Sequence, residues 1–242
     1  PLLCALPRNA EDKTMADTIQ IGILLYPDVT QLDATGPAQV LGRVPGAKLH
    51  MIWKTRDPVP TDAGFSIVPT TTFAECPQLD VICVPGGGGQ VALMTDEETL
   101  AFLRKQAAGA RYVTSVCTGS LVLGAAGLLK GYRSACHSAS RDMLPAFGAI
   151  PVAERVVRDR NRISGGGVTA GIDFGLTMAA EQAGEEIAKS IQLVLEYDPQ
   201  PPFDAGSPEK AGAERVARLK ERIAGMLQKR LEANQAAASR LQ

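Results

Sequence analysis

The feature that most constrains the fold of this chain is a repeated alternation of short buried segments with helical ones. Residues 19–26, 79–84 and 110–116 read as short strands, and turn residues and a helical segment follow each of them. Strands that are buried on both faces and alternate with helices form parallel sheets. The alternation therefore predicts an α/β fold of the flavodoxin-like, doubly wound kind: a mostly parallel sheet with helices on both faces.

Composition divides the chain into parts. Residues 1–14 look foreign to the fold, because their apolar part is too short for a secretion signal and Met15 directly precedes the first strand. We predict a non-native or disordered extension there and an α/β domain over residues 15–207. Residues 198–208 contain four prolines and predict an extended linker. Residues 208–242 are rich in Ala, Glu, Lys and Arg and predict a helical C-terminal extension.

The predicted C-terminal helix carries one apolar stripe. Val216, Leu219, Ile223 and Met226 follow one another at alternating spacings of three and four residues. Such a stripe packs either on the domain of its own chain or on a partner, as the arm of a dimer. The sequence leaves both interpretations open.

The overall composition excludes several classes of function. With 242 residues and 45% hydrophobic content, the chain can bury a sizeable core, and its net charge of −1 gives no general attraction to nucleic acid or to an acidic membrane. No apolar stretch is long enough for a transmembrane helix. Five cysteines without close pairing argue against a disulfide scaffold and for a reducing cytoplasm. Adjacent Cys136 and His137 lack a second ligand pair, so no metal site is predicted.

Cys117 is the strongest candidate for a functional residue. It lies between the strand predicted over residues 110–116 and a helix predicted over residues 119–129, among small and polar neighbours. At such a junction the helix dipole and free backbone N–H groups favour the thiolate, which is a nucleophile. The alternative is a buried structural cysteine, the role that we assign to Cys83 inside its apolar run.

Other candidates follow from the rule that ligands bind outside the carboxyl ends of the strands in an open α/β sheet. Asp33 lies in the loop after the first strand, where it could act as an acid or base or could equally cap a helix. Gly87 and Gly88 belong to a glycine run after residues 79–84. Their N–H groups could bind a developing negative charge, and a flexible turn would also explain the run.

Two further positions are candidates for the pocket or for a mobile segment. His137 follows a short predicted strand and could act as a base, although a lone histidine in this setting is more often structural. Gly166 is the centre of a triple glycine, which could let the backbone approach a pocket or let a helix move. Packing explains the triple glycine equally well.

Several separated motifs together resemble a known family. Residues 84–87, followed by the strand–Cys117–helix junction, are similar to the ThiJ/PfpI branch of the class-I glutamine-amidotransferase-like superfamily. Within that branch, residues 31–33, 79–89 and 114–120 resemble the bacterial isonitrile (isocyanide) hydratases. The similarity extends over most of the chain, and agreement among separated motifs makes it specific.

The resemblance implies an enzyme that hydrates an isonitrile, R–N≡C, to an N-substituted formamide. It implies a homodimer that needs neither a metal nor an organic cofactor. Cys117 would attack the isonitrile carbon to form a thioimidate, with Asp33 as general acid and base. A thiolate nearby would raise the pKa of Asp33, so that this carboxyl could hold the proton. Thr118 would position the sulfur or the acid through its hydroxyl or its N–H.

Departures from related patterns narrow the resemblance further. No histidine follows His137, so the late His-x-Glu of the glutamine amidotransferases is missing, and Thr118 stands where PfpI-type peptidases have a histidine. Ser138 replaces an aromatic residue that we associate with the hydratases, which implies a different pocket shape.

Two alternatives remain open. One is a cysteine-based stress or redox protein, in which Asp33 stabilises a sulfinate on Cys117. The other is a non-catalytic small-molecule sensor domain, which the lack of a DNA-binding region in this sequence disfavours.

Overall fold

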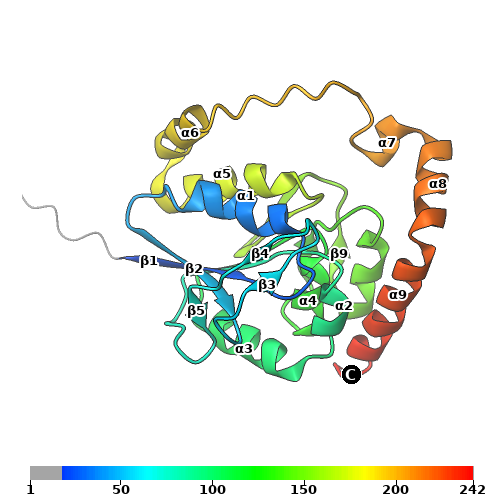
Figure 1. Ribbon diagram of the computed structural model, residues 1–242, viewed down its shortest axis with the longest axis horizontal. Helices are drawn as coiled ribbons and strands as arrows, with labels where there is room; N and C mark the ends of the chain where they lie inside the picture. The colour runs from blue at the N-terminus through cyan, green and yellow to red at the C-terminus, as the bar shows by residue number, and fades with distance from the viewer. Residues whose placement is uncertain (1–17, 242) are drawn as a thin grey trace, which may run out of the picture.

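The fold is known from a computed structural model, which describes residues 18–241 (Figure 1). Its centre is a seven-stranded sheet with the order β10-β11-β7-β6-β1-β2-β5. All neighbouring strands are parallel except the β10–β11 hairpin. The doubly wound, mostly parallel sheet predicted from the sequence is therefore confirmed. The extension predicted over residues 1–14 and the proposed start at Met15 lie outside the described residues.

The strands of this sheet are β1 Ile19–Leu24, β2 Ala47–Trp53, β5 Thr71–Thr72, β6 Val81–Val84, β7 Tyr112–Val116, β10 Val156–Asp159 and β11 Arg162–Gly165. Two small two-stranded sheets pair β3 Val59–Pro60 with β4 Ser66–Ile67, and β8 Arg133–Ser134 with β9 Ile150–Pro151. The helices of the domain are α1 Gln31–Leu41, α2 Gln90–Leu93, α3 Glu97–Ala107, α4 Gly119–Ala125, the 3₁₀ helix η1 Arg141–Phe147, α5 Ala170–Ala183 and α6 Glu185–Val194.

Helices cover both faces of the sheet and form two cores. Helices α1, α5 and α6 lie on one face, and α2, α3, α4 and η1 lie on the other (Figure 1). Successive side chains of a strand point to opposite faces. On β6, Val81 packs in the core beneath α1 and α5, and its neighbour Ile82 packs in the core beneath α3 and α4. This two-sided burial explains why the strand sequences are continuous apolar runs.

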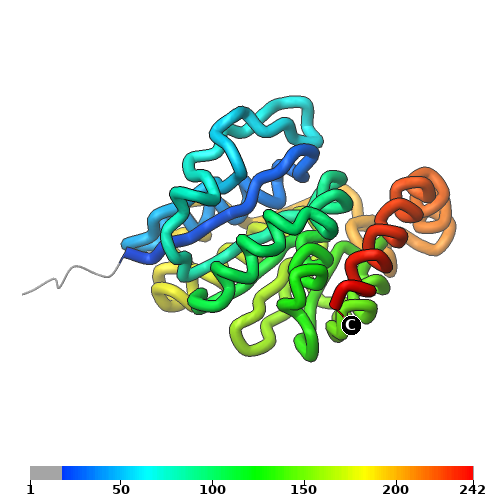
Figure 2. Tube along the Cα trace, turned by 90° about the horizontal axis from the view of Figure 1, so that it is seen from below, coloured from blue at the N-terminus to red at the C-terminus, as the bar shows by residue number. Residues whose placement is uncertain are grey.

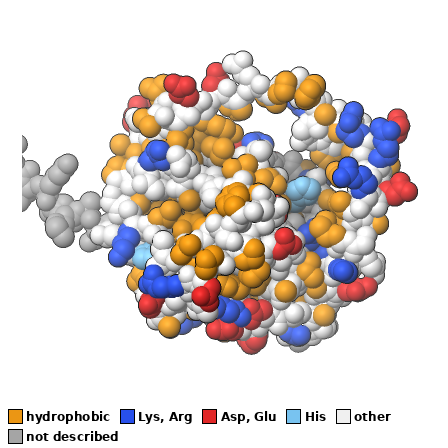
Figure 3. Space-filling view, in the orientation of Figure 1, with side chains coloured by type: hydrophobic (Ala, Val, Ile, Leu, Met, Phe, Trp, Pro, Cys, Tyr) orange, Lys and Arg blue, Asp and Glu red, His pale blue; other side chains and the backbone are white. Residues whose placement is uncertain are grey.

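The C-terminal extension differs from the single helix expected from the sequence. It forms three helices, α7 Pro208–Ala211, α8 Ala213–Arg222 and α9 Ala224–Ala238. Gly212 has a positive φ of 81°, which interrupts the helical path between α7 and α8. Before them, residues 198–207 contain neither helix nor strand and stand clear of the domain, with open space beneath them (Figure 3).

Docking of the extension is confined to its last helix. Helix α9 buries Arg230, Asn234 and Ala237, and Asn234 donates a hydrogen bond of 3.2 Å to the carbonyl of Met143. Figure 2 shows this helix beside the segment that contains η1. Helix α8 buries none of its residues. Docking on the chain's own domain therefore holds for α9 and not for α8. No helix among residues 18–241 is both long and apolar enough to span a membrane.

Candidate active site

Cys117 lies on a strained turn at the carboxyl end of β7. Its φ of 58° is in the left-handed region, which residues other than glycine rarely adopt. The Cys117 N–H donates a hydrogen bond of 3.0 Å to the carbonyl of Gly165, which ties the turn to β11. Two residues on, a Cβ at Gly119 would lie 1.9 Å from the carbonyl oxygen of Val84. The tight junction therefore requires glycine there, and it places the sulfur at the edge of the sheet.

Asp33 is directed toward this junction and away from the start of its own helix. It lies in the first turn of α1, whose N-cap position is Thr30. Its Oδ2 accepts a hydrogen bond of 2.9 Å from the N–H of Gly86, in the loop after β6. Its Oδ1 is buried and has no hydrogen-bond partner among residues 18–241. The interpretation of Asp33 as a helix cap is therefore wrong, and one of its carboxyl oxygens is left to carry a proton.

The glycine run after β6 is a packed turn, not a flexible one. A Cβ at Gly87 would lie 2.5 Å from the carbonyl oxygen of Asp28, and the φ of Gly87 is 144°. The Gly87 N–H donates a hydrogen bond of 3.2 Å to the hydroxyl of Thr118. This N–H is thus engaged and not available to a substrate, in contrast to the expectation from the sequence. The Gly88 N–H has no acceptor in the described part of the chain.

These residues surround one cavity of about 290 Å³. Among the candidates from the sequence, Cys117, Thr118, Gly87, Gly88 and His137 line it. The rest of the lining consists of residues that the sequence did not single out as site residues, namely Asp28, Thr30, Asp62, Ala139, Val168, Ile223, Met226 and Arg230. The small cavity can accommodate a compact organic molecule next to the sulfur.

Asp33 lies behind the cavity wall, beside Gly86. A Cβ at Gly86 would lie 2.6 Å from the N of Thr118 and 2.9 Å from the Oδ2 of Asp33, so these groups converge there. Gly166 is different: it does not line the cavity, and its N–H donates to the carbonyl of Arg155 at 2.9 Å. The structure therefore places Gly166 against the β10 segment and not in the pocket.

His137 lines the cavity as a neutral side chain. Its Nδ1 accepts a hydrogen bond of 3.3 Å from the N–H of Ala139. Burial lowers the pKa of His137, and the nearby Arg230 cation lowers it further. A base at this position would have to act through Nε2, since Nδ1 is already engaged.

Burial dominates the ionisation of Cys117 and Asp33. It raises the pKa of Asp33 to about 7, against the hydrogen bond from the Gly86 N–H, which lowers it. It also raises the pKa of the Cys117 thiol well above its ordinary value, and the charge of Asp33 adds to this effect. The Thr118 N–H favours the thiolate, as expected at a helix start, but burial outweighs it. The two groups therefore titrate as one coupled pair, and its protons belong to the pair and not to either residue alone.

The C-terminal extension supplies one wall of the cavity, which the sequence did not predict. Ile223, Met226 and Arg230 all lie in or next to α9. The sequence does contain a clue to this role of Arg230. This residue follows Met226 by four positions, so it continues the apolar stripe with a cation. A charge that follows in the register of an apolar stripe indicates a cation on the packing face of the helix.

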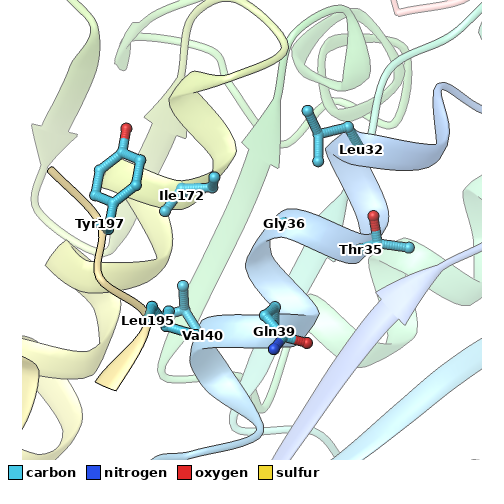
Figure 4. A pocket seen from close by; sticks show the side chains of 8 residues that line it. All are labelled: Leu32, Thr35, Gly36, Gln39, Val40, Ile172, Leu195 and Tyr197. Atoms are coloured by element: carbon cyan, nitrogen blue, oxygen red, sulfur yellow. The ribbon is translucent and has the colours of Figure 1, made fainter. Parts of the chain in front are cut away.

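A second cavity of about 400 Å³ lies between α1, α5 and the segment after α6. Figure 4 shows the side chains that line it, which are Leu32, Thr35, Gly36, Gln39, Val40, Ile172, Leu195 and Tyr197. This lining contains no cysteine, histidine or carboxylate, whereas the lining of the smaller cavity contains both Cys117 and His137. The cavity at Cys117 is therefore the candidate active site. No cluster of three or more potential metal ligands of the His, Cys, Asp and Glu types exists within residues 18–241.

Comparison with known proteins assigns the chain to a family. Residues 19–181, well over half of the chain, match the DJ-1/PfpI family, and the chain therefore belongs to it. This confirms the ThiJ/PfpI resemblance that the motifs indicated.

Particular relatives extend the comparison beyond the family. The chain is 56% identical to the isonitrile hydratase of Pseudomonas putida over 92% of its own length and 98% of that protein. A ThiJ/PfpI family protein from Pseudomonas syringae, known from its crystal structure, is 48% identical, with a TM-score of 0.87 over 95% of this chain and 97% of that one. The HTH-type transcriptional regulator GbdR of Pseudomonas aeruginosa is 31% identical over 74% of this chain and 50% of the regulator.

Proposed function

We propose that this protein is an isonitrile hydratase, which adds water to R–N≡C and releases an N-substituted formamide. The observation that carries the proposal is the pair of buried, titratable side chains Cys117 and Asp33 beside a small cavity. An isonitrile carbon accepts a nucleophile only when a proton arrives as the bond forms, and this pair supplies both. Identity of 56% to the Pseudomonas putida isonitrile hydratase, over nearly the whole of both chains, supports the same reaction.

In the first half of the reaction, the Cys117 sulfur attacks the terminal carbon of the isonitrile. A C–S bond forms, and Asp33 transfers its proton to the same carbon, which gives the thioimidate S–CH=N–R and a carboxylate. The free Oδ1 of Asp33 is the oxygen that has no other hydrogen bond to lose. Thr118 positions the sulfur through its N–H, and its hydroxyl holds the glycine turn by accepting the hydrogen bond from Gly87.

In the second half, the Asp33 carboxylate accepts a proton from a water molecule as this water attacks the thioimidate carbon. Asp33 passes this proton to the nitrogen, so that the tetrahedral intermediate is S–CH(OH)–NH–R. The C–S bond then breaks, the hydroxyl proton returns to Asp33, and the formamide leaves with the thiolate restored. In total, one isonitrile and one water molecule give one formamide, and both side chains return to their starting states. Gly88, whose N–H has no acceptor in the described part of the chain, is a backbone donor on the cavity wall.

Incubation of the protein with a small alkyl isonitrile, such as n-butyl isonitrile, is expected to yield the N-alkylformamide. The reaction is followed by the formyl proton in NMR, and ¹⁸O-labelled water should place the label in the formamide oxygen. Heat-denatured protein at the same concentration measures the uncatalysed background. Absence of formamide above that background would refute the proposed reaction.

The rate constant kcat/KM is expected to rise with pH and to level off above about 7, the pKa to which burial raises Asp33. Below this value the pair carries two protons and no negative charge, so the reactive one-proton form falls about tenfold per pH unit. Because the pKa of Cys117 is raised as well, no decline is expected up to pH 9. A midpoint near pH 4, the ordinary range of an aspartate, would contradict the proposed ionisation.

The two other functions make different predictions at Cys117. A redox role would use the same Cys117 thiolate as the hydratase, so the burial and raised pKa of this thiol do not separate the two functions. A sensor role has support in the similarity to a transcriptional regulator, of which this chain spans half the length. Formamide turnover separates both alternatives from the enzyme. The homodimer and the cytoplasmic location remain predictions from the sequence.

A further inference from the structure

Arg230 is a buried cation without a carboxylate partner. Only 4% of it is exposed, and its Nη1 donates a hydrogen bond of 2.8 Å to the hydroxyl of Ser140. Its Nη2 contacts the sulfur of Met226 at 3.7 Å, and its buried Nε has no partner among residues 18–241. No ion pair of Arg230 occurs in that part of the chain. An unpaired buried charge is costly, so a group that forms a negative charge nearby is expected.

The groups that can supply this negative charge are few. The guanidinium interacts electrostatically with Cys117, Cys136 and Tyr26. Burial raises the pKa of Cys136 to about 11 and that of Tyr26 well above its ordinary value, so both are neutral near pH 7. Tyr26 and Cys117 both interact electrostatically with Asp33, but of the three groups only Cys117 lines the cavity together with Arg230.

Other charged groups around the cavity are less suited to this role. Asp28 and Asp62 come from loops on the opposite wall and are exposed, so solvent screens them. His137, from the loop after β8, is kept neutral by burial and by Arg230 itself. Arg141 of η1 acts on Cys136 and is itself partly exposed. Arg230 is thus the buried cation that shares the cavity with the nucleophile.

We propose that Arg230 is a positioning residue that supplies the counterion for the anionic Cys117–Asp33 pair. The buried cation lines the same cavity as Cys117, and Ser140 fixes its orientation. In such surroundings one cation stabilises the negative form far more than it would in water. The C-terminal extension therefore completes the electrostatics of the site, because the docking of α9 brings the charge into place. The inference rests on the proposed nucleophilic role of Cys117.

The test measures the ionisation of Cys117 and needs no isonitrile. The rate of Cys117 alkylation by iodoacetamide is recorded between pH 5 and 10, with peptide mass spectrometry to separate Cys117 from the other cysteines. Arg230→Met keeps the side-chain length and removes the charge, and it should lower the rate at pH 7 by about tenfold, which corresponds to one pKa unit. Arg230→Lys keeps the charge and should stay within about threefold of the parent protein.

Lys229→Met is the matched control. It removes a positive charge from the exposed face of the same helix and should leave the alkylation profile unchanged. If Arg230→Met folds, as judged by circular dichroism, and its profile equals that of the parent protein, the proposal is overturned.

A second pair of variants keeps the proposal testable if Arg230→Met does not fold. Met226→Glu places a carboxylate one helical turn from Arg230, where the two side chains can pair. Ile223→Glu adds the same charge to the same cavity wall at seven residues from Arg230, outside the three- and four-residue spacings that favour pairing on a helix. Met226→Glu should raise the pKa of Cys117 by about one unit more than Ile223→Glu, because it also withdraws the counterion. Equal shifts would overturn the proposal.

The outcome is independent of the proposed reaction. An altered alkylation profile in Arg230→Met together with no formamide in the parent protein would retain the counterion and reject the hydratase. Formamide turnover in the parent protein, with unchanged alkylation profiles in Arg230→Met, would retain the hydratase and reject the counterion.

Discussion

Replacement of Cys117 by alanine is expected to abolish formamide formation, with a loss of roughly 10⁴-fold or more, as is typical when a nucleophile is removed. The reason is that no other described group can form the covalent intermediate, because His137 is neutral with Nδ1 engaged and Cys136 is fully protonated at neutral pH. Turnover of n-butyl isonitrile, followed by the formyl proton in NMR, measures the effect.

The fold is expected to survive this substitution. Alanine keeps the Cβ that the left-handed turn already accommodates, and the lost sulfur lies next to a cavity. Cys76→Ala is the matched control, since Cys76 is a free cysteine outside the cavity lining, and it should keep parental turnover. Formamide production by folded Cys117→Ala above the rate of heat-denatured protein would refute the covalent mechanism. It would leave addition of water activated by Asp33 alone.

The sequence predicts the fold because the burial of each strand can be recognised from the strand's own residues. An apolar run such as residues 79–84 packs on both of its faces, and the two cores of the structure are the direct result. Placement of Cys117 and Asp33 together was also predictable, since the carboxyl ends of parallel strands meet at one edge of the sheet. Local signals of this kind need no knowledge of distant contacts.

Properties that depend on distant contacts were not predictable in the same way. The dipole of the following helix suggested a thiolate at Cys117, but burial by segments far along the chain raises the pKa of this thiol. The breaks at Gly212 and Ile223 let α9 dock separately from α8, and only then does Arg230 enter the cavity. Gly166, similarly, lies in a packed segment, where an added Cβ would be 3.2 Å from the carbonyl oxygen of Glu154. The sequence pattern predicts the helices and strands, whereas the packing of distant segments determines the pKa of Cys117 and the position of Arg230.

Replacement of Asp33 by asparagine is expected to reduce turnover by about 10²- to 10⁴-fold, the usual contribution of a general acid and base. An amide can accept the hydrogen bond from the Gly86 N–H as the carboxylate does, so the geometry should be kept. It cannot deliver a proton to the isonitrile carbon or take one from water. Asp33→Glu keeps the carboxyl group but displaces it, so its turnover should lie between that of the parent protein and that of Asp33→Asn. Near-parental turnover in Asp33→Asn would remove Asp33 from the mechanism.

Stability measurements provide an independent control on the same variant. The pKa of Asp33 is raised from 3.8 to about 7 on folding, so the folded state binds more protons than the unfolded state between these values. The contribution of Asp33 to the free energy of unfolding is therefore complete below about pH 4. It is lost as the pH rises through about 7, and the total loss is roughly 4 kcal/mol. Asp33→Asn cannot ionise and should lack this decline, so denaturation in urea at pH 5 and pH 8 should show a smaller difference than for the parent protein. An equal decline in both proteins would mean that Asp33 does not carry the neutral-pH proton, and the acid–base role would then have to pass to another group at the cavity.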